Sequence, residues 1–140
     1  MKSILCAIDG SERAAGVVAA ASELARGMGA KLTLFRAISI PPEISHDLYR
    51  NAEATLHGVL MTQAEKALTE FAARFPEPVP ETRIETGTSW DAICRTAQKL
   101  ECDLIVLGSH GFGTTDRFLG TTAMRVVSEA SCSVLVIRIA

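Results

Sequence analysis

The sequence lacks the features that mark membrane-spanning and nucleic-acid-binding proteins. No apolar stretch is long enough to cross a bilayer, and the apolar run before Asp9 is too short for the core of a signal peptide. The formal net charge is −2, so there is no excess of Lys and Arg to attract a phosphate backbone. We therefore expect a cytoplasmic protein that neither inserts into a membrane nor binds nucleic acid.

Paired cysteine motifs are also missing. The four cysteines lie far apart and form no C-x-x-C pair; they are Cys6, Cys94, Cys102 and Cys132. This spacing indicates neither a zinc site nor a disulfide framework. Each cysteine sits in an apolar stretch, which favours a buried thiol in a reducing compartment, with a redox role as the alternative.

The sequence has no signature of fast phosphoryl or nucleotidyl transfer. It contains no G-x-x-x-x-G-K-[ST] loop, no H-x-G-H and no S-G-G-x-D-S, and rapid phosphoryl transfer depends on positioned charge of that kind. His46-Asp47 and the nearby His57 resemble part of a metal-hydrolase set, but no second His-Asp pair or carboxylate cluster completes it. We expect no catalytic residue.

Short apolar runs alternate with segments of helical periodicity along the 140 residues, of which 48% are hydrophobic. The runs are Ser3–Ile8, Lys31–Ala37, Pro80–Thr86, Leu104–Gly108 and Val134–Ile139. This alternation predicts one α/β domain, residues 1–140, with a doubly wound, Rossmann-like, five-stranded parallel sheet. Right-handed crossovers give the strand order 3-2-1-4-5, which places a ligand site between the ends of strands 1 and 4.

Apolar spacing predicts four helices between the strands. The first ends at the C-cap Gly29, the third has Ser89 as its N-cap, and the fourth follows Gly120. In the long second connection only the latter half, to Phe75, is periodic, so residues 41–58 are expected to be irregular. The side chains expected to face inward are Ala14, Val17, Val18, Ala21, Leu24, Ala25 and Met28; Leu60, Ala64, Ala67, Leu68, Phe71 and Phe75; Ile93, Ala97 and Leu100; and Ala123, Val126, Val127 and Ala130.

A glycine-rich segment follows the fourth predicted strand. Gly108-Ser109-His110-Gly111 is separated by eight residues from Gly120-Thr121-Thr122 at the head of the last helix. Glycines let backbone N–H groups approach an anion, and a helix N-terminus adds free amides and the positive end of a dipole. Two such elements would hold a polyphosphate. The alternative is that the glycines only shape the loop and Thr121 only caps the helix.

The chain resembles the universal stress protein family over nearly all of its length. The resemblance rests on G-x-x-G, a spacer and G-[S/T], together with Ala7-Ile8-Asp9-Gly10-Ser11 and the tail Ala130–Val136. The spacer of eight residues is one shorter than the family's commonest form. The resemblance implies the ATP-binding branch of the family and an adenine nucleotide α-hydrolase-like fold.

The resemblance also implies a role for each matching residue. Asp9 would accept hydrogen bonds from the ribose or approach a phosphate-bound Mg²⁺, with an N-cap shared with Ser11 as the alternative. Ala7 and Ala37 would line the adenine pocket, and His110 would touch phosphate or orient the loop. The remaining contacts of the ribose and phosphates would come from Leu107, Gly108, Gly111, Gly120, Thr121 and Thr122. Arg36 and Arg117 are ambiguous, and so is Trp90, which would pack over the crevice or anchor its helix.

These features together favour an ATP-binding regulator of stress response or signalling, with AMP or ADP as other ligands and at most weak ATP hydrolysis or autophosphorylation. The alternatives are a nucleotide-free dimeric adaptor and a slow ATP hydrolase, in which Ser109, Thr121 or Thr122 would be phosphate acceptors. The apolar last strand lies at the predicted sheet edge, so we expect a homodimer through this edge. The alternative is that the chain's own long connection covers it.

Overall fold

The structure is a computed structural model that describes residues 1–38, 50–109 and 119–139, with the side chains of the second helix described from Leu56 onward. Strands and helices alternate along the chain. The elements are β1 (Ser3–Ala7), α1 (Ala14–Met28), β2 (Lys31–Ile38), α2 (Arg50–Ala72), β3 (Glu81–Thr86), α3 (Ser89–Lys99), β4 (Leu104–Gly108), α4 (Thr121–Glu129) and β5 (Ser133–Ile137).

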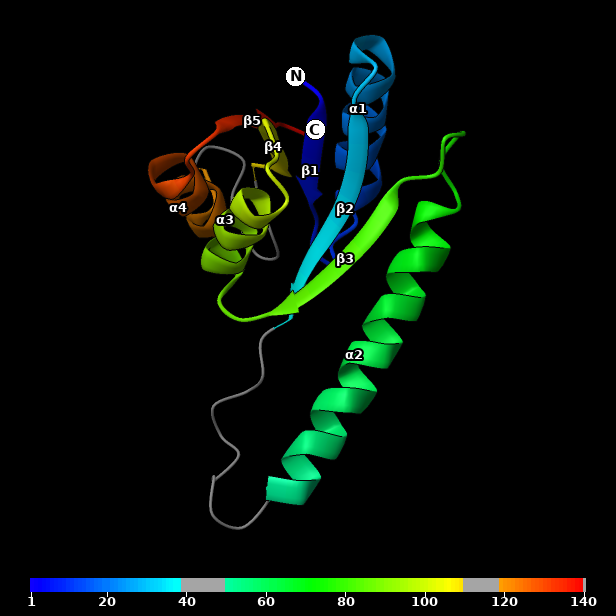
Figure 1. Cartoon of the computed structure of the whole chain (residues 1–140), viewed down its shortest axis with the longest axis vertical. Helices are drawn as coiled ribbons and strands as arrows, with labels where there is room; N and C mark the ends of the chain where they lie inside the picture. The colour runs from blue at the N-terminus through cyan, green and yellow to red at the C-terminus, as the bar shows by residue number, and fades with distance from the viewer. Residues whose placement is uncertain (39–49, 110–118, 140) are drawn as a thin grey trace.

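All five strands pair in parallel in the order β3-β2-β1-β4-β5, which confirms the predicted fold (Figure 1). The central strand β1 pairs with β2 on one side and with β4 on the other, so Ala7 has Phe35 and Leu107 as its two partners. Because α1 leaves β1 toward one face of the sheet and α4 leaves β4 toward the other, the chain diverges at this point.

The alternation of side chains along the strands divides the core between the two faces of the sheet. Ile4 and Cys6 of β1 pack with α1 and the C-terminal part of α2, whereas Leu5 and Ala7 pack with α3 and α4. The side chains of β2 alternate in the same way, with Leu34 on the first face and Phe35 on the second. The site described below lies on the α3 and α4 face.

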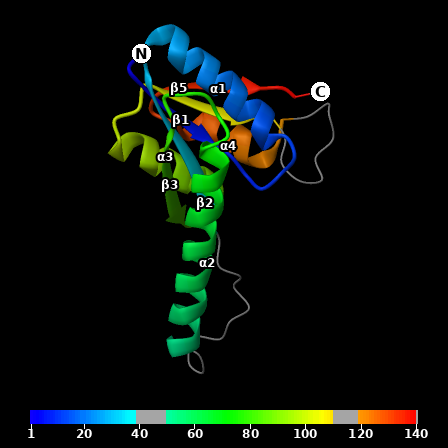
Figure 2. The ribbon, with the colours of Figure 1, turned by 90° about the vertical axis from the view of Figure 1, so that its right-hand side faces the viewer.

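The helix α2 begins earlier than predicted. It starts at Arg50, so the expectation of an irregular segment through residue 58 is wrong from that residue onward; residues 39–49 lie outside the described part. Its C-terminal part packs on β2 and β3 through Leu68 and Ala72, and its N-terminal part projects past the sheet (Figures 1 and 2). Leu56 and Val59 are exposed there, and this missing core contact explains the weak apolar periodicity.

Helix ends and inward faces follow the predictions with four differences, one of which is that Ala67 of α2, expected to face inward, is exposed. Gly29 caps α1 in the left-handed conformation as expected, with φ 64°. The N-cap of α3 is Thr88, so the assignment of Ser89 to that position was wrong by one residue. Met28 and Val127, expected to face inward, are 39% and 52% exposed because each lies at the edge of its helix's apolar stripe.

The cysteines occupy two kinds of environment. Cys6 and Cys102 are buried, as predicted, while Cys94 and Cys132 are only half-buried. Burial raises the pKa of the Cys6 thiol to about 12, and it also raises the pKa of Cys94 and of Cys132. Within the described residues, no helix combines the length and the apolar character needed to cross a membrane.

Candidate nucleotide site

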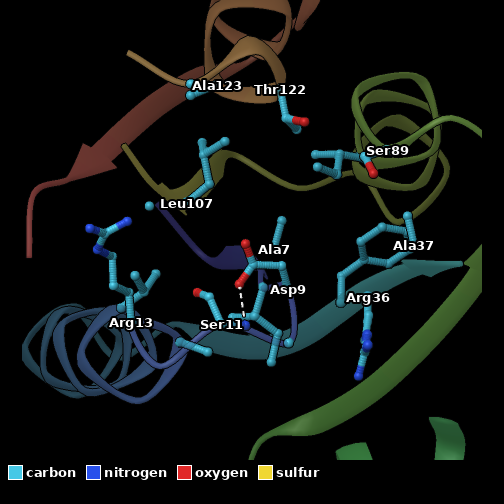
Figure 3. Close-up of a pocket in the computed structure, with 18 of the residues that line it drawn as sticks. Ala7, Asp9, Ser11, Arg13, Arg36, Ala37, Ser89, Leu107, Thr122 and Ala123 are labelled. Atoms are coloured by element: carbon cyan, nitrogen blue, oxygen red, sulfur yellow. Dashed lines mark hydrogen bonds between the residues drawn. The ribbon is translucent and has the colours of Figure 1, made fainter. Parts of the chain in front are cut away.

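A cavity of about 660 Å³ opens at the carboxyl ends of β1, β2 and β4, on the face covered by α3 and α4 (Figure 3). This volume lies within the usual range for small-molecule sites. Its floor is formed by the ends of the strands, and the starts of α1, α3 and α4 form its walls. It is located at the switch point predicted for a doubly wound sheet.

All predicted site residues that the structure describes line this cavity. They are Ala7, Asp9, Ala37, Leu107, Gly108, Gly120, Thr121 and Thr122. His110, Gly111 and Arg117 lie outside the described residues, as do His46 and Asp47. The elements that carry the residues are far apart in sequence, and the parallel sheet brings their ends to one edge.

Asp9 closes a tight turn and leaves part of its carboxylate for the cavity. Its Oδ1 accepts a hydrogen bond from the backbone N–H of Ser11 over 2.8 Å. Figure 3 shows the second oxygen directed away from this bond, toward Leu107. The N-cap of α1 is Arg13, so the alternative of a cap shared by Asp9 and Ser11 is wrong.

The start of α4 supplies the donors at the other wall. Gly120 is its N-cap, so Thr121 is the first helical residue and the alternative of a Thr121 cap is wrong. The Gly120 amide donates to the carbonyl of Ser109 over 2.6 Å, which corrects the expectation that this amide is free for a ligand. The amides of Thr121 and Thr122 have no acceptor within the helix because they belong to its first turn. With the positive end of the dipole, they favour an anion here.

Sequence reasoning missed several residues of the cavity, and four of them bear on what it can bind. Phe35 and Ile93 are buried and make its wall apolar near Ala37, while Ser89 adds a hydroxyl at the start of α3. Because side chains alternate along β2, Phe35 lies on the same face of the sheet as Ala37, and this position could have been predicted from the sequence. Arg13 is the fourth. It lies two residues after the Asp9–Ser11 segment and belongs to none of the motifs identified in the sequence.

Trp90 belongs to the packing between α3 and α4. The guanidinium of Arg125 lies 4.2 Å from the centre of its ring, and the side chain packs against the core of that face. Trp90 is not among the residues that line the cavity. Of the two roles considered for Trp90, the structure supports the one in which its side chain anchors α3.

Side-chain metal ligands are sparse in the described part of the chain. No group of three or more His, Cys, Asp or Glu is placed there to hold a metal ion. His57 belongs to α2 and does not line the cavity. The described charged side chains among the lining residues are Asp9, Arg13 and Arg36.

Residues 1–138 match the universal stress protein family. The chain belongs to this family. Universal stress protein A homolog 1 from Coxiella burnetii is 33% identical over 141 residues, which cover 97% of this chain and 95% of that protein. The solved structure of the universal stress protein UspA from Lactobacillus plantarum superimposes with a TM-score of 0.80 at 29% identity, covering 98% and 97% of the two chains.

Two more distant solved structures of universal stress proteins share the fold and contain nucleotides. One is a complex with cAMP, 22% identical with a TM-score of 0.67, covering 97% of this chain and 96% of that one. The other, from Archaeoglobus fulgidus, is a complex with dAMP, 20% identical with a TM-score of 0.66, covering 98% of each chain. At these identities the likeness to the present chain is one of fold.

Proposed function

We propose that this universal stress protein binds an adenine nucleotide, with ATP as the principal ligand, and acts as a regulator of stress response or signalling. The observation that carries the proposal is the 660 Å³ cavity, which has an apolar end, a carboxylate in the middle and a helix N-terminus at the far end. A nucleotide has the same order of base, sugar and phosphate. The nucleotides in the cAMP and dAMP complexes of family members support an adenine ligand.

The adenine ring would lie among Ala7, Ala37 and the buried side chains of Phe35 and Ile93. Small residues at two of these positions leave room for a planar ring. The backbone N–H and C=O of Ala37 would pair with the base edge, because β2 ends at the next residue. The second carboxylate oxygen of Asp9 would accept from the ribose hydroxyls.

The phosphates would lie against the amides and hydroxyls of Thr121 and Thr122, with Gly108 and Gly120 allowing close approach. His110 and Gly111 complete the proposed glycine motif. Mg²⁺ bound by a nucleotide is usually held by one or two carboxylates and by phosphate oxygens, and Asp9 is the described lining residue that fits this role. The ion would neutralise phosphate charge.

We propose a regulatory role in place of rapid catalysis. Fast phosphoryl transfer requires a lysine on the phosphates and a group that orients the nucleophile, and the described lining residues include no lysine. Slow hydrolysis, or phosphate transfer to Thr121, Thr122 or Ser109, stays an alternative that timed release of ADP would detect.

Mass spectrometry of freshly purified, denatured protein tests the binding proposal directly. Co-purified ATP, ADP or AMP at near one per chain supports it. Calorimetric titration with ATP is the second measurement, with Asp9→Asn as the variant, because asparagine keeps an oxygen for the Ser11 amide but loses the charge. An empty pocket and no binding heat or thermal shift with ATP would support the nucleotide-free adaptor instead.

We further propose a homodimer through β5. This strand pairs only with β4 among the described strands, and Leu135 on it is 38% exposed. The described part of the long connection, α2, covers β2 and β3 at the opposite side of the sheet, which argues against the connection as a cover for β5. Light scattering of the purified chain and of Leu135→Glu tests this proposal, with a shift from dimer to monomer expected for the variant.

A further inference from the structure

Two arginines of the described part of the chain line the cavity, and the fold gives them different positions. Arg13 is the N-cap residue of α1, and Arg36 lies near the end of β2. Figure 3 shows the Arg13 side chain extending from the start of α1 toward Leu107 and Ala123, at the opposite end of the cavity from Ala37. This is also the end where α4 begins.

The Arg36 side chain points the other way. Phe35 and Ala37 belong to the core on the α3 and α4 face, so the alternation of β2 sends Arg36 to the opposite face. Figure 3 shows its side chain leaving the cavity. Arg36 therefore borders the cavity through its backbone, and among the described residues Arg13 is the cation whose side chain shares the cavity with the α4 N-terminus.

We propose that Arg13 is a specificity-determining residue that makes this pocket select nucleotides with a diphosphate or triphosphate chain over nucleoside monophosphates, cyclic nucleotides and nucleosides. This inference rests on the proposed function and names the ligand class more narrowly. The amides of Thr121 and Thr122 suffice for a single phosphate, whereas a diphosphate or triphosphate chain carries one or two further negative charges. Arg13 lies on the wall facing those amides, so the chain passes between them.

The chemistry of arginine suits this position. Its guanidinium stays charged and offers five N–H donors that match phosphate oxygens in pairs. Arg13 also interacts within the chain, and the number of its donors leaves capacity for a phosphate as well. Asp9 supplies the nearest described negative charge among the lining residues, and it faces the sugar position.

The test compares four ligands on four proteins by calorimetric titration at two salt concentrations. The ligands are ATP, AMP, cAMP and adenosine, each with and without Mg²⁺, and the proteins are the wild type, Arg13→Gln, Arg13→Lys and Arg36→Gln. Arg36→Gln is the matched control because it removes the same charge from a residue that also borders the cavity but whose side chain leaves it. Arg13→Lys is the second variant, which keeps the charge if glutamine impairs folding.

Wild type is expected to bind ATP at least about tenfold more tightly than AMP or cAMP, consistent with a charge-assisted hydrogen bond. Arg13→Gln should remove most of that difference by weakening ATP alone, while Arg36→Gln should leave ATP affinity within about twofold. Arg13→Lys should retain a preference for ATP, and the preference should shrink as salt rises.

Three results would overturn the inference. Arg13→Gln with unchanged ATP affinity would show that the side chain does not contact the phosphates. Equal losses for ATP, AMP and adenosine would show a structural role without selectivity. A wild type that binds AMP as tightly as ATP would leave the proposed function standing and remove this inference, whereas a wild type that binds none of the ligands would remove the proposed function itself.

Discussion

The amide of Gly120 donates a hydrogen bond to the carbonyl oxygen of Ser109 over 2.6 Å, although nearly the whole glycine-rich segment separates the two residues. Ser109 in turn donates its own amide to Ile137 at the end of β5. The end of β4, the start of α4 and the end of β5 are therefore fastened together at the wall of the cavity. Gly120 is buried and lines the cavity, and its φ of −62° is open to any residue, so a side chain there would take up cavity space without straining the backbone.

Replacement of Gly120 by valine should therefore abolish nucleotide binding without unfolding the protein. The isopropyl group would occupy the cavity beside Ser109, and ATP affinity should fall at least about 100-fold by calorimetry. Gly58→Val is the matched control, because Gly58 is exposed in α2 and a Cβ there meets nothing within 4 Å. Retained affinity in Gly120→Val would mean that the phosphates bind elsewhere.

The Arg125–Trp90 contact should contribute measurably to the packing of α3 on α4. Arg125→Met keeps the length of the side chain and removes its charge, so we expect a loss of about 0.5–1 kcal/mol in the free energy of unfolding by urea titration. The emission of Trp90, the single tryptophan, should shift as well. Arg74→Met is the control, since Arg74 lies 5.8 Å from the Phe71 ring and its contact, in the turn after α2, joins no second helix. Equal losses in both variants would argue against a specific contact.

Asp103 should make the stability of the protein depend on pH in the acidic range. Its Oδ2 accepts hydrogen bonds from the backbone amides of Lys2 and Ser3, at 2.7 and 3.0 Å, and these bonds lower its pKa. A carboxyl with a lowered pKa stabilises the fold above its ordinary value of 3.8, and the stabilisation is lost as the pH falls through the lowered pKa. Asp103→Asn should flatten the stability profile below about pH 4, and an unchanged profile would contradict this assignment.

Cys6 should be the slowest cysteine to react in the folded protein. With its pKa raised to about 12 from 9.0, its thiolate is about a thousandfold rarer than that of an ordinary thiol at pH 8. Timed alkylation with iodoacetamide followed by peptide mapping should label Cys94 and Cys132 first and Cys6 last. Labelling of all four at one rate would indicate that the reagent reacts only with unfolded chains.

The sequence predicted the strand order and the position of the site because both depend on local patterns. Five apolar runs separated by segments of helical periodicity are compatible with few parallel-sheet topologies. In the predicted topology the ends of β1 and β4 lie side by side, whatever the sequence of the loops. The glycine-rich segment was recognised from its own spacing, and the family resemblance added the roles of Asp9 and of the individual motif residues. The cytoplasmic location and the motif residues His110 and Gly111 stay predictions.

The differences arose where a residue's role depends on the contacts of another segment. The start of α2 was missed because its projecting part packs against no core, so its apolar residues have no helical periodicity. Val127 was predicted to face inward because its spacing fits the apolar face of α4. The backbone hydrogen bond between Gly120 and Ser109 joins the two ends of a loop, and a contact of this kind leaves no periodic pattern in the sequence. Arg13 belongs to the cavity only because α4 begins opposite to it.

Two of the strands whose ends form the cavity floor, β1 and β4, are neighbours in the interior of the sheet. In β1 and β4, Ile4, Leu5, Cys6, Ile105 and Val106 are fully shielded from solvent. Their amides should therefore be the slowest to exchange with deuterium, opening only when the entire protein unfolds. The cavity floor should therefore keep its shape while the surrounding helices fluctuate. A ligand that dissociates would then rebind to the same surface.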